Sequence, residues 1–122
     1  DNYRNEQAEW LAQVVKSEEY CRAKWHVVVG HIPPRPVKDM WHGQYEVLRK
    51  FVPILNEAKV DVMLCGHLHR HIINQPDNEV KFPVVVNSLD HVISGWTEGQ
   101  NLHLDMYDTK GTLVEKFTVK AK

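Results

Sequence analysis

Two short apolar runs that each end in glycine and histidine constrain the fold of this 122-residue chain more than any other feature. The first is Val27-Val28-Val29-Gly30-His31, and the second is Val62-Met63-Leu64-Cys65-Gly66-His67. Neither run alternates apolar with polar residues, as a strand with one face in water would. We therefore expect two buried strands of a parallel sheet, each with a histidine just beyond its carboxyl end.

The elements around these runs follow an order typical of an α/β layer. A helix is expected from Asn5 to about Ser17, with Asn5 as its cap, because apolar residues recur there at three- and four-residue spacing. The prolines of the segment 30–36 exclude helix and central strand from it. The further elements expected are strands at 25–29, 60–65 and 81–87, helical stretches at 44–51 and 54–58, and an antiparallel hairpin of 102–107 with 113–119. The sequence thus predicts one layered α/β domain over residues 1–122, with a mixed sheet and a C-terminal hairpin.

Composition excludes several other classes of protein. Lys and Arg number 15 and Asp and Glu 16, so a net charge of −1 gives no signal for nucleic acid or an anionic membrane. An apolar share of 43% and a charged share of 25% are those of an ordinary globular domain. No apolar run reaches the roughly 18 residues of a membrane span. The two cysteines, Cys21 and Cys65, are expected to stay reduced, with Cys65 in the core.

The strand-Gly-His repeat predicts a ligand site. In an open α/β sheet ligands bind beyond the carboxyl ends of the strands, which is where His31 and His67 would lie. In an extended segment His67 and His69 would point to the same side, because they are two residues apart. Three imidazoles converging in this way suit a divalent transition metal. The alternative is a set of half-exposed histidines on surface loops.

The same residues carry a resemblance to a known superfamily. Gly30-His31-Ile32-Pro33-Pro34 resembles the fourth block of the calcineurin-like metallophosphoesterases, which include the purple acid phosphatases. Gly66-His67-Leu68-His69 is similar to the fifth block, Gly-His-x-His. Gln7-Ala8-Glu9-Trp10-Leu11 is similar to the helix that precedes the fourth block. The resemblance covers most of residues 6–87, in family order.

This resemblance implies a fold, a chemistry and a set of ligands. The fold would be half of an αββα sandwich, and the parent protein would hydrolyse a phosphate ester. His31 and His67 would bind one metal of a two-metal centre, and His69 the other. The usual metals of the family are manganese, iron and zinc. A pair of cations about 3.5–4 Å apart orients the ester and generates hydroxide for in-line attack.

Three family blocks are absent from the sequence. They are Asp-x-His, Gly-Asp-x-x-Asp and Gly-Asn-His followed by an acid, and they would supply the bridging aspartate and the histidine that assists the leaving group. The resemblance therefore implies the C-terminal portion of a catalytic domain, inactive alone, with the missing N-terminal half as its partner. No catalytic residue is assigned within the chain. A sheet edge left open by that half would favour dimerisation.

A second function is left open by the sequence. Three histidines alone resemble in ligand type a zinc site with one open position, so the chain could be a non-catalytic metal-binding or interaction module. The other histidines, with Arg70, Asp90 and Trp96, also have expected places. The candidates for substrate contact are Arg70, His71 and His42. Asp90-His91 is expected in a polar loop, and Trp96 is expected on a mobile loop. Structural roles are expected for His26, in a strand, and for His103, on the hairpin.

Overall fold

The computed structural model describes residues 2–35 and 42–121. Its helices are α1 (Asn2–Val14), α2 (Glu18–Arg22), α3 (His42–Lys50) and α4 (Val52–Glu57). Its strands are β1 (Val27–Val29), β2 (Val62–Cys65), β3 (Ile72–Asn74), β4 (Val84–Val86), β5 (Val92–Glu98), β6 (Asn101–Tyr107) and β7 (Leu113–Lys120). Within these residues no helix is both long and apolar enough to cross a membrane.

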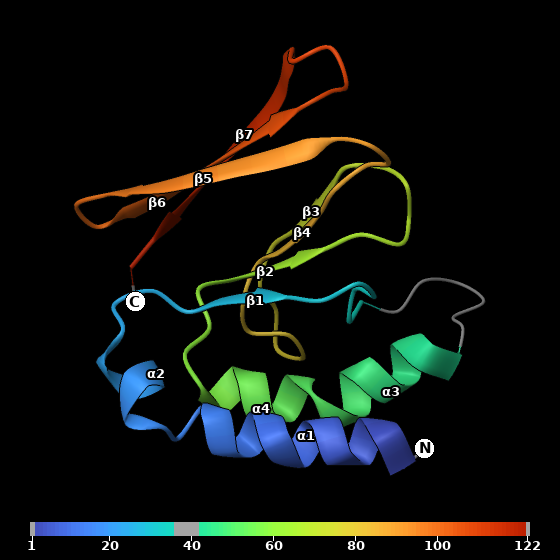
Figure 1. Ribbon diagram of the computed structural model, residues 1–122, viewed down its shortest axis with the longest axis vertical. Helices are drawn as coiled ribbons and strands as arrows, with labels where there is room; N and C mark the ends of the chain where they lie inside the picture. The colour runs from blue at the N-terminus through green and yellow to red at the C-terminus, as the bar shows by residue number, and fades with distance from the viewer. Residues whose placement is uncertain (1, 36–41, 122) are drawn as a thin grey trace.

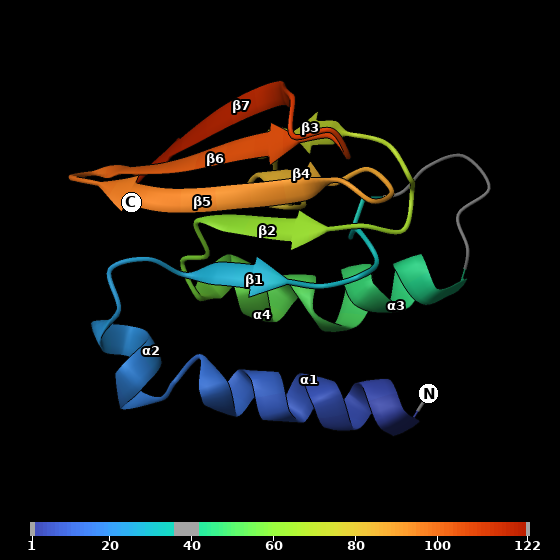
Figure 2. The same ribbon diagram turned by 45° about the horizontal axis from the view of Figure 1, so that its top comes forward.

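The strands form two sheets that are stacked in layers. One sheet has the order β1-β2-β4-β3, in which β1, β2 and β4 run parallel and β3 runs antiparallel. The other is the antiparallel sheet β5-β6-β7. The helices α1, α3 and α4 lie on one side of the four-stranded sheet, and the three-stranded sheet lies on the other (Figures 1 and 2). The expected α/β class, mixed sheet and closing hairpin are confirmed.

Alternate residues of the central strands build two cores. Val84 and Val86 of β4 face the helices, in a cluster that also holds Leu55 and Phe82. Val85, between them in the chain, faces the second sheet instead. A strand buried on both faces needs apolar residues at every position, which is why β2 and β4 read as continuous apolar runs.

The first strand departs from the expectation of a buried strand. β1 lies at the edge of its sheet, with β2 on one side and no described strand on the other. Val27 is 45% exposed and Val29 is 79% exposed, while Val28 between them packs on the helix-side core. The prediction that 25–29 is buried on both faces is therefore wrong, because an apolar run does not reveal whether a neighbour covers it.

Other differences are local. α1 begins at Asn2 rather than at Asn5, and the polar stretch after it contains the short helix α2. Trp96, expected on a mobile loop, lies in β5 opposite His103 of β6. β5 contains Gly95, which reads as a loop signal, but a Cβ there would lie 3.1 Å from the Leu104 side chain, so the glycine permits close packing.

Candidate metal centre

Backbone hydrogen bonds join the two Gly-His segments beyond the ends of their strands. β1 and β2 pair in parallel with Val29 opposite Leu64, and the Gly30 N–H donates to the Leu64 carbonyl at 3.0 Å. The Gly66 N–H donates in turn to the carbonyl of His31 at 3.0 Å. The pairing of β1 with β2 therefore continues into the loops, and it brings the two histidines to the same edge of the sheet.

The rings of His31 and His67 face each other there. His31 Nε2 lies 3.3 Å from His67 Nδ1, and the ring planes are at 84° with centroids 5.1 Å apart. This separation is longer than the roughly 2.9–3.0 Å usual for a hydrogen bond from an N–H donor. Two nitrogens bound to one tetrahedral ion at about 2.0–2.1 Å lie about 3.3–3.4 Å apart. The pair thus fits two ligands of a single transition-metal ion.

His69 lies on the same pocket without joining that pair. The pocket has a volume of about 590 Å³ and is lined by His31, His67 and His69 together with Asn87, Ser88 and Asp90, among others. Within residues 2–35 and 42–121, no three His, Cys, Asp or Glu side chains are placed to hold one ion. The Ser88 hydroxyl donates to the His69 carbonyl at 3.1 Å, which ties the His69 backbone to the loop after β4.

The segment carrying His67 and His69 is not extended, although an extended segment was the basis for expecting the two side chains on the same side. Both residues have left-handed backbones, with φ of 72° at His67 and 59° at His69. Asp90, across the pocket, has φ of 59°. Non-glycine residues rarely adopt this conformation, and strained residues of this kind cluster at functional sites. The chain thus turns after β2 at two histidines with positive φ.

The strain at His69 leads to a stability prediction. We expect His69→Gly to be more stable than His69→Ala by about 1 kcal/mol, because glycine adopts positive φ without steric cost. Urea unfolding followed by circular dichroism measures the difference. His71→Gly and His71→Ala are the matched control, since φ at His71 is not positive and glycine should there be the less stable residue. Equal stabilities of the two His69 variants would contradict the prediction.

One carboxylate and one thiol also line the pocket. Asp90 is the carboxylate among the described lining residues, and the pocket is otherwise formed by histidines, small polar residues and apolar side chains. Burial raises the pKa of the Cys65 thiol to about 12, so it is protonated at neutral pH. Cys65 is 6% exposed and belongs to the helix-side core, as expected from the sequence.

A second histidine pair, which the sequence did not connect, lies beside the pocket. His71 Nε2 is 2.7 Å from His91 Nδ1, and the Asn87 side chain donates to the His91 carbonyl at 2.8 Å. The two histidines are separated by 20 positions, and their pairing depends on β3 and β4 lying side by side. No local pattern signals such a contact.

The other candidates lie elsewhere. His42 begins α3 and faces Glu46 at 3.2 Å, and neither His42 nor Arg70 lines the pocket. His26 precedes β1 rather than lying in a strand, and its ring stacks on Tyr20 at 3.9 Å. His103 contacts Thr118 on β7 at 3.2 Å. Neither His26 nor His103 is among the described residues that line the pocket.

Comparison with known proteins identifies one family. A family model described as calcineurin-like phosphoesterase matches residues 1–71, which is more than half of the chain. The matched stretch contains β1 and β2 with both Gly-His segments, and it ends before β3. No curated protein matches the sequence.

Proposed function

Because the chain belongs to the calcineurin-like phosphoesterase family, we propose that it supplies three histidine ligands to the two-metal centre of a phosphoesterase. His31 and His67 would hold one ion, and His69 would hold the other. The observation that carries the proposal is the 3.3 Å separation of the His31 and His67 ring nitrogens at the ends of adjacent parallel strands.

The donor set supports the same metals that the resemblance implies. Neutral imidazole suits zinc, iron and manganese when carboxylates complete the coordination. When bound, two such ions would orient a phosphate ester and activate the attacking water. The part of this chain in the reaction would be to fix the positions of the imidazoles, through the hydrogen bond from Gly66 to the His31 carbonyl and the bond from Ser88 to the His69 carbonyl.

The remaining ligands would come from polypeptide outside residues 1–122, and the chain alone would be inactive. Asp90 is the one described carboxylate on the pocket, whereas a two-metal centre needs acidic groups that bridge the ions.

An apolar groove of about 580 Å³ lies beside β1, lined by Trp10 and Leu11 of α1 among others. Val29, Gly30 and His31 line both groove and pocket, so a segment packed along β1 would reach the metals. In the absence of such a segment, a second copy of the chain could pair with the exposed edge of β1.

Calorimetric titration with Mn²⁺ and with Zn²⁺ tests the histidine ligands. We expect the wild-type chain to bind a metal ion specifically. We expect the double variant His67→Ala, His69→Ala to bind no ion, because it keeps only one of the three imidazoles. His103→Ala is the matched control, since it removes a histidine that contacts Thr118 on the hairpin. Binding retained in the double variant would contradict the proposal.

A further inference from the structure

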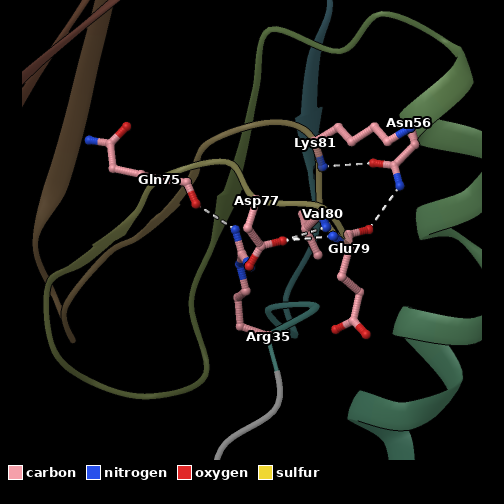
Figure 3. Close-up of polar contacts among 7 residues, drawn as sticks. All are labelled: Arg35, Asn56, Gln75, Asp77, Glu79, Val80 and Lys81. Atoms are coloured by element: carbon pink, nitrogen blue, oxygen red, sulfur yellow. Dashed lines mark hydrogen bonds and ion pairs between the residues drawn. The ribbon is translucent and has the colours of Figure 1, made fainter.

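The described part of the loop after β1 runs from His31 to Arg35, and the Arg35 side chain anchors it. The Arg35 guanidinium forms an ion pair with the Asp77 carboxylate, and its Nη2 donates to the Gln75 carbonyl at 2.6 Å (Figure 3). The Arg35 side chain is 15% exposed, so it lies largely against the protein. Arg35 therefore joins the first Gly-His loop to the segment between β3 and β4.

The Asp77 carboxylate that binds Arg35 is itself held by backbone hydrogen bonds. Its Oδ1 accepts the backbone N–H groups of Glu79 and Val80, both at 2.9 Å. The hydrogen bond from Val80, and after it the one from Arg35, hold the pKa of the Asp77 carboxyl below its usual range. Val80 is completely buried in the helix-side core. The Asp77 side chain is itself 54% exposed, and it is fixed by these backbone hydrogen bonds, one of which comes from a buried residue.

The chain between His31 and Arg35 is stiff. Pro33 and Pro34 are fully buried, and each proline ring fixes φ near −65°. Ile32 precedes a proline, which restricts its own conformation as well. The His31 carbonyl is held at the other end by the Gly66 N–H. These restrictions leave the backbone between Arg35 and His31 few conformations with which to adjust to a shift of Arg35.

We propose that Arg35 is a positioning residue for His31: by binding Asp77 and the Gln75 carbonyl it sets the orientation of the His31 ring toward His67. The consequence for metal binding rests on the proposed function, in which His31 is a ligand. The orientation of the His31 ring does not depend on the proposed function, and it can be measured in the chain without metal.

Asn56 provides a matched control for a merely structural role. Its side chain donates to the Glu79 carbonyl and accepts from the Lys81 N–H, each at 2.9 Å (Figure 3). It anchors the same segment as Arg35, but to α4 instead of to the loop of His31. Removing either residue takes away a contact of that segment, whereas only the loss of Arg35 also takes away a contact of the loop that carries His31.

The first measurement is imidazole NMR of the metal-free chain. We expect Arg35→Ala to shift the Cε1–H signal of His31 and to weaken the nuclear Overhauser effect between the His31 and His67 rings. Arg35→Lys should recover part of the wild-type signal, because it keeps a cation for Asp77. Asn56→Ala should leave the signal in place. A His31 signal that responds equally to Arg35→Ala and Asn56→Ala would overturn the proposal.

A second variant covers the case in which Arg35→Ala does not fold. Asp77→Asn keeps an oxygen for the N–H groups of Glu79 and Val80 and removes the charge that pairs with Arg35. We expect it to move the His31 signal in the same direction as Arg35→Ala. An unchanged His31 signal in folded Asp77→Asn would also overturn the proposal.

Zinc titration separates this inference from the proposed function. Loss of a direct hydrogen-bond partner of a ligand typically weakens metal binding about 10–100-fold. Arg35 acts through the loop and not by contact with His31, so we expect a loss at the lower end of this range, about tenfold, in Arg35→Ala and no loss in Asn56→Ala. Wild-type affinity in Arg35→Ala, with binding that still requires His67 and His69, would refute the positioning role alone. If the wild-type chain binds no zinc, the proposed function fails, while the NMR comparison still decides the role of Arg35.

Discussion

Phe82→Ala is expected to lower the free energy of unfolding by about 3–5 kcal/mol, which is the usual cost of removing a buried aromatic ring. Phe82 is 1% exposed and packs in the helix-side core with Leu55 and Val86. That core fixes α3 and α4 to the sheet, so a cavity there has few ways to close. Urea unfolding followed by tryptophan fluorescence measures the loss.

Trp96→Ala is the control for this prediction. Trp96 is 46% exposed on β5 and stacks on His103, so its removal deletes an even larger aromatic group, but from the surface. We expect a clearly smaller loss of stability than for Phe82→Ala. A loss for Phe82→Ala below about 1 kcal/mol, typical of an exposed site, would mean that this core is not closely packed.

Zinc at 100 times its dissociation constant is expected to stabilise the wild-type chain by about 2.7 kcal/mol, if only the folded state binds the ion. For a domain of this size that corresponds to a rise in Tm of roughly 10 °C. His31→Ala should abolish the rise, because it removes one nitrogen of the closely spaced pair. Differential scanning calorimetry with and without zinc measures both values.

Two comparisons sharpen the zinc experiment. His103→Ala should keep the full rise in Tm, since His103 contacts β7 away from the pocket. Zinc bound by the unfolded chain would lower the rise equally in all variants, so the difference between His31→Ala and His103→Ala is the informative quantity. A rise of equal size in these two variants would place the stabilising ion away from His31.

The parts of the fold that follow from local pattern were predicted correctly. Continuous apolar runs indicate β2 and β4, and the helical stretches expected at 44–51 and 54–58 correspond to α3 and α4. The hairpin of β6 and β7 closes at 108–111, where the Gly111 N–H donates to the Asp108 carbonyl at 3.1 Å. Each of these features depends on neighbours within a few residues, which a sequence displays directly.

The errors concern properties that only the assembled chain has. The exposure of β1 depends on which strand lies beside it, and β5 is a strand because it pairs with β6 along seven residues. The ion pair of Arg35 with Asp77 joins positions 42 apart, and the contact of His71 with His91 joins positions 20 apart. The candidate ligands were found because Gly-His is a local motif, whereas the contacts that support them are not local.

The edge position of β1 also bears on how the chain opens. α1 has no buried residue among those described, and β1 has a partner strand on one side only. In native-state hydrogen exchange we therefore expect residues 2–30 to open at a lower free energy than β2 and β4, as one partly independent unit. His31 directly follows this unit in the chain, while His67 directly follows β2 and its neighbour Gly66. A metal ion bound by both rings would then link the unit that opens first to the more stable part of the sheet, and would raise the free energy of that opening.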